Sequence, residues 1–84
     1  MNASITNQAS ELASLIRHSG GPRYVVFDPA KDELGSFRSD LSSSARLYRD
    51  LRWRVIGRYF GDVDSKTLTK DLREWKDLRQ KQAA

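Results

Sequence analysis

The sequence predicts a small, mainly α-helical domain with three helices, over residues 6–19, 44–60 and 67–81, and one short β-strand over residues 23–28. Apolar side chains recur every three or four residues in the helical segments, which is the spacing of a helix with one buried face. Only residues 23–28 combine β-branched and aromatic side chains with flanking prolines, a pattern typical of a strand. A chain of 84 residues is long enough for one hydrophobic core, so we expect a single domain over residues 1–84.

The first predicted helix begins near Thr6 or Asn7, whose side-chain oxygens can accept hydrogen bonds from the free amides of the first turn. Gly20 and Gly21 end it, because glycine adopts the left-handed conformation that closes a helix. His18 lies in its last turn, where a positive charge is favoured. The apolar face of this helix consists of Ala9, Leu12, Leu15 and Ile16.

The segment "PRYVVFDP" contains the predicted strand. The polar segment "AKDELGSFRSD" that follows is expected to be a loop, with one short helical turn over residues 30–34. A single strand leaves backbone groups on both of its edges without hydrogen-bond partners. We therefore expect the strand to pair elsewhere in the chain, to pair with its own copy in a homodimer, or to lie extended across the helices.

Two apolar arcs favour a helix over residues 44–60, because each recurs at helical spacing. One arc consists of Leu47, Leu51, Val55 and Tyr59, and the other consists of Trp53, Ile56 and Phe60. A helix with two apolar arcs is expected to lie between other elements or against a partner. The alternative is that "LRWRVIGRYF" forms a strand paired with "RYVVF". Ile56 and Phe60 are out of phase with the alternation of a strand, so the helix is favoured.

The third predicted helix, over residues 67–81, begins with Thr67 or Thr69 as its cap. Its apolar stripe consists of Leu68, Leu72, Trp75 and Leu78. Acidic and basic side chains are mixed on the rest of its surface, which is typical of a helix docked on a core and solvated outside. We do not expect this helix to hold phosphates.

The whole chain has a net charge of +4, and its positive charge is concentrated in the second half. Residues 1–36 carry three basic and four acidic side chains, whereas residues 37–84 carry twelve basic and seven acidic side chains. Residues 46–58 alone contain five arginines and one aspartate. A basic segment of this kind is typical of proteins that bind polyanions, above all nucleic acids.

The arginine-rich segment supplies the predicted nucleic-acid-binding residues, which are Arg46, Arg49, Arg52, Trp53, Arg54 and Arg58. Arginine has forked donors that match phosphate oxygens and the edge of guanine. On a helix the first three arginines lie along one side and the last two on another, so one continuous strip uses two or three of the five. Trp53 is the one aromatic residue of this segment that we expect to be exposed.

The residue types argue against an enzyme. His18 is the only imidazole, and no base lies near the serines at 42–44 to activate a nucleophile. With one histidine and no cysteine the chain lacks a metal-ligand pattern, and no glycine-rich phosphate loop indicates a nucleotide, so we expect neither metal nor cofactor. No apolar run is long enough to cross a bilayer, and no secretory signal is apparent, which favours a cytoplasmic protein that does not bind membranes.

Residues 41–82 resemble the N-terminal core-binding (SAM-like) domain of tyrosine recombinases and phage integrases. The resemblance rests on Ser42–Ser44, Tyr48, Leu51, Gly61–Asp62, Leu68–Thr69 and Trp75. It implies a helical, DNA-clamping module of bacterial or mobile-element type, with its contacts on residues 46–58. The catalytic domain of that family, with its tyrosine nucleophile, has no counterpart in this sequence, so the resemblance implies no strand cleavage.

A second segment, "RYVVFDPAKDEL", is similar to the opening strand and helix of ParE/RelE-type toxins. This similarity implies a basic protein that acts on gyrase or on ribosome-bound mRNA. The sheet that follows in those toxins is not evident from the sequence, and an additional helix precedes the strand.

Together these observations predict a small basic nucleic-acid-binding protein without catalytic activity, with DNA as the expected partner. The alternative is a protein–protein interaction module, such as an inhibitor, regulator or assembly subunit, because arginine, tyrosine and tryptophan are also enriched at protein interfaces. A homodimer is expected under both hypotheses. The choice between DNA, RNA and protein as the target stays open at this point.

Overall fold

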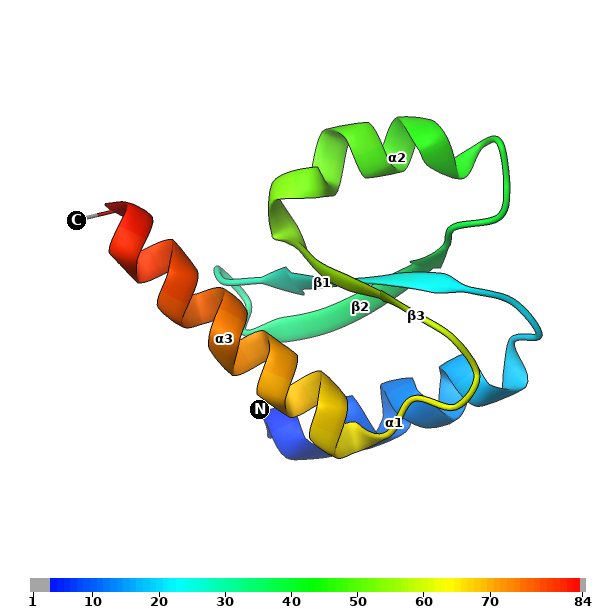
Figure 1. Ribbon diagram of the computed structural model, residues 1–84, viewed down its shortest axis with the longest axis horizontal. Helices are drawn as coiled ribbons and strands as arrows, with labels where there is room; N and C mark the ends of the chain where they lie inside the picture. The colour runs from blue at the N-terminus through cyan, green and yellow to red at the C-terminus, as the bar shows by residue number, and fades with distance from the viewer. Residues whose placement is uncertain (1–3, 84) are drawn as a thin grey trace.

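The computed structural model describes residues 4–83 (Figure 1). In chain order its elements are α1 (Ile5–His18), β1 (Arg23–Asp28), β2 (Glu33–Arg38), α2 (Ser44–Leu51), the 3₁₀ turn η1 (Arg52–Arg54), β3 (Val55–Tyr59) and α3 (Ser65–Ala83). The strands form one antiparallel sheet in the order β2–β1–β3. The prediction of a mainly helical chain with one strand is therefore wrong, because the described residues combine three helices with a three-stranded sheet.

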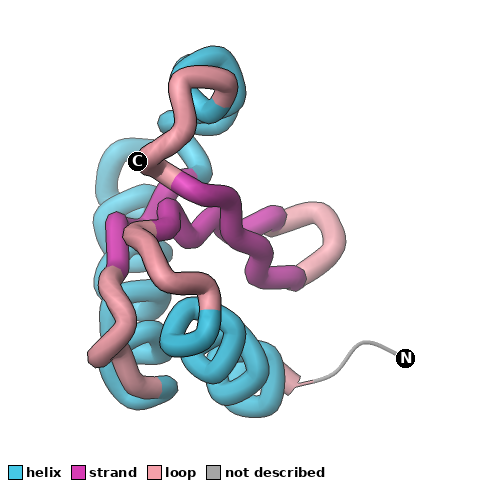
Figure 2. Tube along the Cα trace, turned by 90° about the vertical axis from the view of Figure 1, so that its right-hand side faces the viewer, coloured by secondary structure: helices cyan, strands magenta, loops and turns pink. Residues whose placement is uncertain are grey.

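The sheet separates two layers of helix (Figure 1 and Figure 2). α1 and α3 cover one side, which we call the α1/α3 face, and α2 lies over the other side, which we call the α2 face. Successive side chains of a strand point to opposite faces. Val25 and Phe27 of β1 therefore point to the α1/α3 face, and Tyr24 and Val26 point to the α2 face.

The hydrophobic core lies on the α1/α3 face. Its buried residues are Ala9, Leu12, Ala13, Ile16, Val25, Tyr59, Val63 and Leu68. The predicted apolar faces of α1 and α3 are confirmed in part, because Leu15 and Leu78 are exposed.

The cap of α1 lies two or three residues before its predicted position. Ser4 is the N-cap, and its Oγ accepts a hydrogen bond of 3.2 Å from the backbone amide of Asn7. Thr6 and Asn7 are thus inside the helix and do not cap it. The predicted end is confirmed: the helix stops at His18, and Gly20 takes the left-handed conformation with φ +76°.

The predicted loop after β1 contains a second strand. Residues 29–32 form the turn of a hairpin, and β2 then runs back along β1 with Phe27 opposite Leu34. The residue pattern does not predict β2, because only Leu34 and Phe37 of its six residues are large and apolar. The Gln8 side chain of α1 covers its outer edge, accepting from the Leu34 amide at 2.8 Å and donating to the Asp32 carbonyl at 3.2 Å.

The predicted helix over residues 44–60 is also wrong in its second half. α2 ends at Leu51, η1 follows, and residues 55–59 form β3 on the free edge of β1. Val55 and Ile56 are β-branched and Gly57 is a weak helix former, so local propensity opposes helix there. Pairing with β1 then supplies hydrogen-bond partners for both strands. The alternative strand pairing of "LRWRVIGRYF" with "RYVVF" is confirmed in part, because residues 55–59 pair with β1 whereas residues 51–54 are helical.

A close contact within β3 requires glycine at position 57. Tyr59 folds back over Gly57, and a Cβ atom added to this glycine would lie 2.8 Å from the tyrosine Oη. The hydroxyl donates a hydrogen bond of 2.6 Å to Asp71 of α3. Burial and the neighbouring carboxylate raise the pKa of Tyr59 well above its ordinary value. Tyr59 therefore joins β3 to α3 and stays protonated.

α3 is capped by Asp64, not by Thr67 or Thr69 as predicted. The Asp64 carboxylate accepts a hydrogen bond of 2.8 Å from the Thr67 amide, and the Thr69 hydroxyl donates to the Ser65 carbonyl inside the helix. Hydrogen bonds from Thr67 lower the pKa of Asp64. The predicted position of the third helix is otherwise confirmed.

Candidate nucleic-acid interface

The first three predicted arginines lie on an exposed rim formed by α2 and η1. Tyr48 turns toward the sheet and stacks on Tyr24, with 4.6 Å between ring centroids. Arg46 and Arg49 are therefore on the outer side of α2, and Arg52 follows in η1. All three are exposed. We call these three residues the arginine rim.

The arginine rim is weakly neutralised by the protein itself. Among the described residues, the only ion pair of the rim joins Arg49 Nε to Asp50 Oδ1 at 3.9 Å, with both side chains largely exposed. Exposed pairs of this length contribute little and exchange readily with other anions. The rim is thus available to phosphate groups.

The last two predicted arginines are held by the protein and do not belong to the rim. Arg54 lies 3.8 Å from Asp28 and stacks on Trp53, with its Cζ 4.3 Å from the ring centroid. Its Nε is buried and has no hydrogen-bond partner among the described residues. Arg58 is in β3 and donates to the Ser39 hydroxyl at 2.9 Å. The structure thus places three of the five arginines on the exposed rim and the other two in contacts with distant residues, because the segment that carries them changes from helix to strand.

Trp53 is exposed to 46%, as predicted, but it is not the only exposed aromatic residue of the segment. Tyr48 and Phe60 are exposed as well, and of the first predicted apolar arc only Tyr59 is buried. Trp53 differs from the other two in its surroundings. It forms one wall of a cleft whose other residues come from distant parts of the chain.

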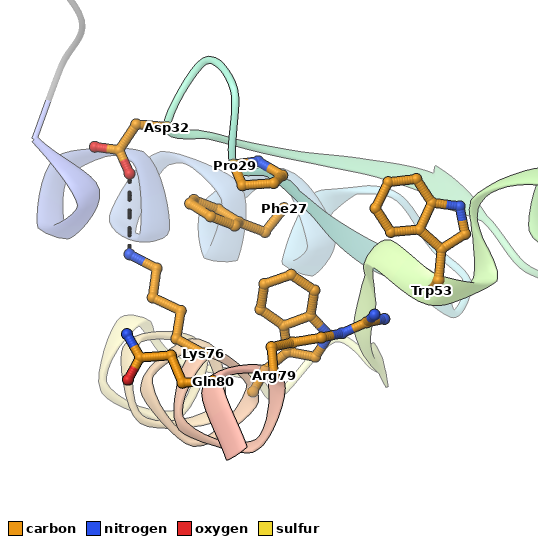
Figure 3. Close-up of a pocket in the computed structure, with 8 residues that line it drawn as sticks. Phe27, Pro29, Asp32, Trp53, Lys76, Arg79 and Gln80 are labelled. Atoms are coloured by element: carbon orange, nitrogen blue, oxygen red, sulfur yellow. Dashed lines mark ion pairs between the residues drawn. The ribbon is translucent and has the colours of Figure 1, made fainter. Parts of the chain in front are cut away.

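The cleft lies between η1, the β1–β2 turn and the C-terminal half of α3 (Figure 3). Its volume is about 380 Å³, and it is lined by Phe27, Pro29, Asp32, Trp53, Trp75, Lys76, Arg79 and Gln80. Phe27 and Trp75 meet edge to face, with their centroids 5.8 Å apart. Three aromatic rings thus form the walls of this opening, which we call the aromatic cleft.

Two cations accompany the rings of the aromatic cleft. The Arg79 guanidinium is shared by both indoles, 5.0 Å from the Trp75 centroid and 5.9 Å from the Trp53 centroid. The Lys76 ammonium lies 4.7 Å from the Phe27 centroid and 3.9 Å from the Asp32 carboxylate (Figure 3). Contacts of this kind hold the cations at the mouth of the cleft while leaving them partly solvated.

Sequence reasoning missed the α3 side of this cleft. Trp75 was expected to be a core residue, and the mixed charges of α3 were expected to be solvent-facing only. The one available signal is that Trp75 and Arg79 are one helical turn apart and can stack. Nothing in the sequence brings Trp53 to the same place, because that contact depends on the turn at η1.

Metal binding and membrane insertion find no support among the residues that the structure describes. No group of three or more histidine, cysteine, aspartate or glutamate side chains is arranged to hold a metal ion there. His18 Nδ1 lies 2.7 Å from the Ser14 carbonyl, and since a carbonyl only accepts, this nitrogen carries the proton. None of the helices over residues 4–83 is both long enough and apolar enough to span a bilayer.

No protein-family model, curated protein or solved structure matches the chain. The helical fold implied by the resemblance to recombinase core-binding domains is not found, because β3 occupies the middle of that segment. The segment "RYVVFDPAKDEL", which is similar to the opening strand and helix of the toxins, contains β1, a turn and the start of β2, so the expected helical turn over residues 30–34 is not found. The arginine rim and the aromatic cleft are the two surface features of the described residues that bear on function.

Proposed function

We propose that the protein binds nucleic acid, with DNA as the expected partner, and has no catalytic activity. The observation that carries the proposal is the arginine rim: Arg46, Arg49 and Arg52 are exposed, adjacent along α2 and η1, and opposed by a single weakly paired acid. Phosphate groups supply the acceptors that these guanidinium groups lack.

The sequence-based hypothesis named all five arginines as nucleic-acid-binding residues, whereas this proposal assigns phosphate contacts to the three of the rim. Arg54 positions Trp53 through the stacking contact and is itself paired with Asp28. Arg58 is bonded to Ser39. The phosphate contacts are therefore assigned to the rim, whereas Arg54 stacks on the Trp53 ring.

Fluorescence anisotropy with a labelled DNA duplex, measured over a range of salt concentrations, tests the proposal. We expect binding at low salt that weakens as salt rises, because each neutralised phosphate contributes about 0.9 to the slope of log affinity against log salt. A variant with Arg46→Ala, Arg49→Ala and Arg52→Ala should bind more weakly and with a shallower slope.

A matched variant with Arg17→Ala, Lys66→Ala and Lys70→Ala is the control. It removes the same formal charge from exposed residues of α1 and the start of α3. Equal losses of affinity in the two variants would show that net charge alone drives binding. The absence of binding by the unmodified protein to both duplex and single-stranded DNA at low salt would refute the proposal.

A protein–protein interaction module is the second candidate, because the α2 face carries exposed apolar residues. Leu41, Leu47 and Tyr48 are each exposed by about two fifths or more, and α2 buries none of its residues. Self-association is one form of this candidate. However, the lone strand no longer argues for it, since β1 is paired on both edges within the chain. A dimer detected by sedimentation at high micromolar concentration and abolished by Leu47→Asp would favour it.

A further inference from the structure

We infer that the aromatic cleft binds one unpaired nucleobase, so that the preferred ligand is single-stranded nucleic acid. This inference rests on the proposed function and adds a specific ligand class to it. Trp53 and Trp75 supply the stacking surfaces beside the buried Phe27, and Lys76 and Arg79 supply the charges for the adjoining phosphate.

The size of the cleft suits a base. Its volume of about 380 Å³ is at the lower end of the range for small-molecule pockets, which runs from about 300 to 1,000 Å³. Stacking on aromatic side chains is the usual way in which proteins hold single-stranded nucleic acid, and it tolerates any base because every base has a π-face. In a duplex those faces are covered by neighbouring bases, so only an unpaired base can enter.

The charges of the cleft select against a cationic ligand. An aromatic pocket with an acid at its edge could in principle hold a methylated ammonium group. Here, however, Lys76 already lies against the Phe27 ring and the Arg79 guanidinium against both indoles. A cationic ligand would have to displace these groups and would be repelled by them, whereas an anionic ligand gains from both.

The two cations can turn to a phosphate without the loss of a strong contact. Lys76 and Asp32 are 3.9 Å apart and both are substantially exposed, so this pair exchanges easily with another anion. Arg79 already places a planar group beside Trp53 and Trp75. A base that takes this place leaves the guanidinium free to contact the phosphate of the same nucleotide.

The position of Trp53 joins the cleft to the arginine rim. Arg52 precedes Trp53 directly in η1, and Arg49 lies one turn before it in α2. A strand whose base occupies the cleft thus has its neighbouring phosphates beside the rim. Arg54, stacked on Trp53 and paired with Asp28, keeps the indole in place before the ligand arrives.

Intrinsic fluorescence gives a direct test, because the two tryptophans of the chain both line the cleft. The probes are a short oligothymidylate, an abasic oligonucleotide with the same number of phosphates, and a duplex of the same length. We expect the oligothymidylate to quench the fluorescence and to bind more tightly than the other two. Trp53→Ala should weaken its binding by about 5- to 150-fold, the usual range for one stacked base.

Two further variants separate stacking from a general effect. Trp53→Phe keeps an aromatic face and should restore most of the affinity for oligothymidylate. Phe60→Ala removes an exposed aromatic residue that also has an arginine over its ring but lies outside the cleft, and it should change the affinity by less than twofold.

The failure of the inference is distinguishable from the failure of the proposed function. If duplex, abasic strand and oligothymidylate bind equally and Trp53→Ala has no effect, the cleft does not bind a base, although the rim still binds phosphates. If none of the three binds at low salt, the proposed function fails and the inference fails with it. Quenching by a trimethyl-lysine peptide in place of oligothymidylate would also overturn the inference.

Discussion

The two faces of the sheet are covered by helices that are held in different ways. α1 buries Ala9, Leu12, Ala13 and Ile16 against the sheet and α3. α2 buries no residue, and the stack of Tyr48 on Tyr24 is its clearest contact with the sheet. The α1/α3 face therefore supplies the stability of the fold, whereas the α2 face presents side chains to solvent.

This difference explains where the candidate interface lies. A helix that contributes little to the core can carry exposed arginines and aromatic residues without a loss of stability. The arginine rim lies on α2 and η1. The aromatic cleft lies where η1 approaches α3. Binding residues are commonly found on segments of this kind that a stable scaffold positions.

The largest expected difference between the faces is in the effect of removing one aliphatic side chain. Ile16 is fully buried, so Ile16→Ala should lower the free energy of unfolding by about 2–5 kcal/mol through lost burial and a cavity. Leu47 on α2 is 41% exposed, and Leu47→Ala should cost less than about 1 kcal/mol. Urea denaturation measures both.

Ile16→Val serves where Ile16→Ala does not fold, and it should cost about 0.5–1.5 kcal/mol. Equal effects of Ile16→Ala and Leu47→Ala would contradict the assignment of the core to the α1/α3 face.

A second comparison adds one methyl group to each face. Gly57→Ala places a Cβ 2.8 Å from the Tyr59 hydroxyl on the α1/α3 face and should cost about 1–3 kcal/mol through overpacking. Gly35→Ala on the α2 face meets Val26 at 3.6 Å, an ordinary contact, and should be nearly neutral. Thermal denaturation of the two variants measures the difference, and a neutral Gly57→Ala would show that Tyr59 does not pack over this glycine.

A third comparison uses the tyrosines. Tyr59→Phe removes the hydrogen bond to Asp71 and should cost about 1 kcal/mol at neutral pH. Because the pKa of Tyr59 is raised in the folded state, the unfolded chain loses this proton first, above about pH 10. The stability of the unmodified protein should therefore fall by up to about 1.4 kcal/mol per pH unit from there upward.

Tyr59→Phe should remove that part of the alkaline decline. Tyr48→Phe, on the α2 face, is the control and should leave the decline unchanged. Urea denaturation between pH 8 and pH 11 compares the three proteins, and parallel curves for all of them would show that Tyr59 ionises as freely as an exposed tyrosine.

A fourth comparison uses Tyr48→Ala, which removes the stack on Tyr24. The global free energy of unfolding should change by less than about 1.5 kcal/mol, the usual upper value for such a stack. Amide hydrogen exchange should show faster opening of α2 with little change in α1, since regions with few buried contacts open locally. Uniform acceleration across both helices would mean that α2 is part of the same cooperative unit as the core.

Much of the α1/α3 face was predictable from the sequence. Ala9, Leu12 and Ile16 of α1 and Leu68 and Leu72 of α3 follow a helical stripe that requires only local spacing. The prediction is wrong for Leu15 and Leu78, which belong to the predicted apolar stripes but are exposed.

The candidate site was predictable only in part. The basic segment and the exposure of Trp53 follow from residue types, but the separation of the arginines into rim and engaged residues does not. Arg54 and Arg58 are engaged because β3 carries them to Asp28 and Ser39, which lie elsewhere in the sequence. The contribution of Trp75 to the cleft depends in the same way on a contact across the fold.

The sequence by itself determined the positions of α1 and α3, the first strand, and the concentration of arginine in residues 46–58. Only the tertiary structure decided that residues 55–59 are a strand and that β2 exists. The physical reason is that helical hydrogen bonds join residues four apart, whereas a strand requires an edge supplied from elsewhere. β1 has two such edges. Pairing with them stabilises residues 33–38 and 55–59 as strands, although the apolar spacing of "RLYRDLRWRVIGRYF" favours a helix throughout.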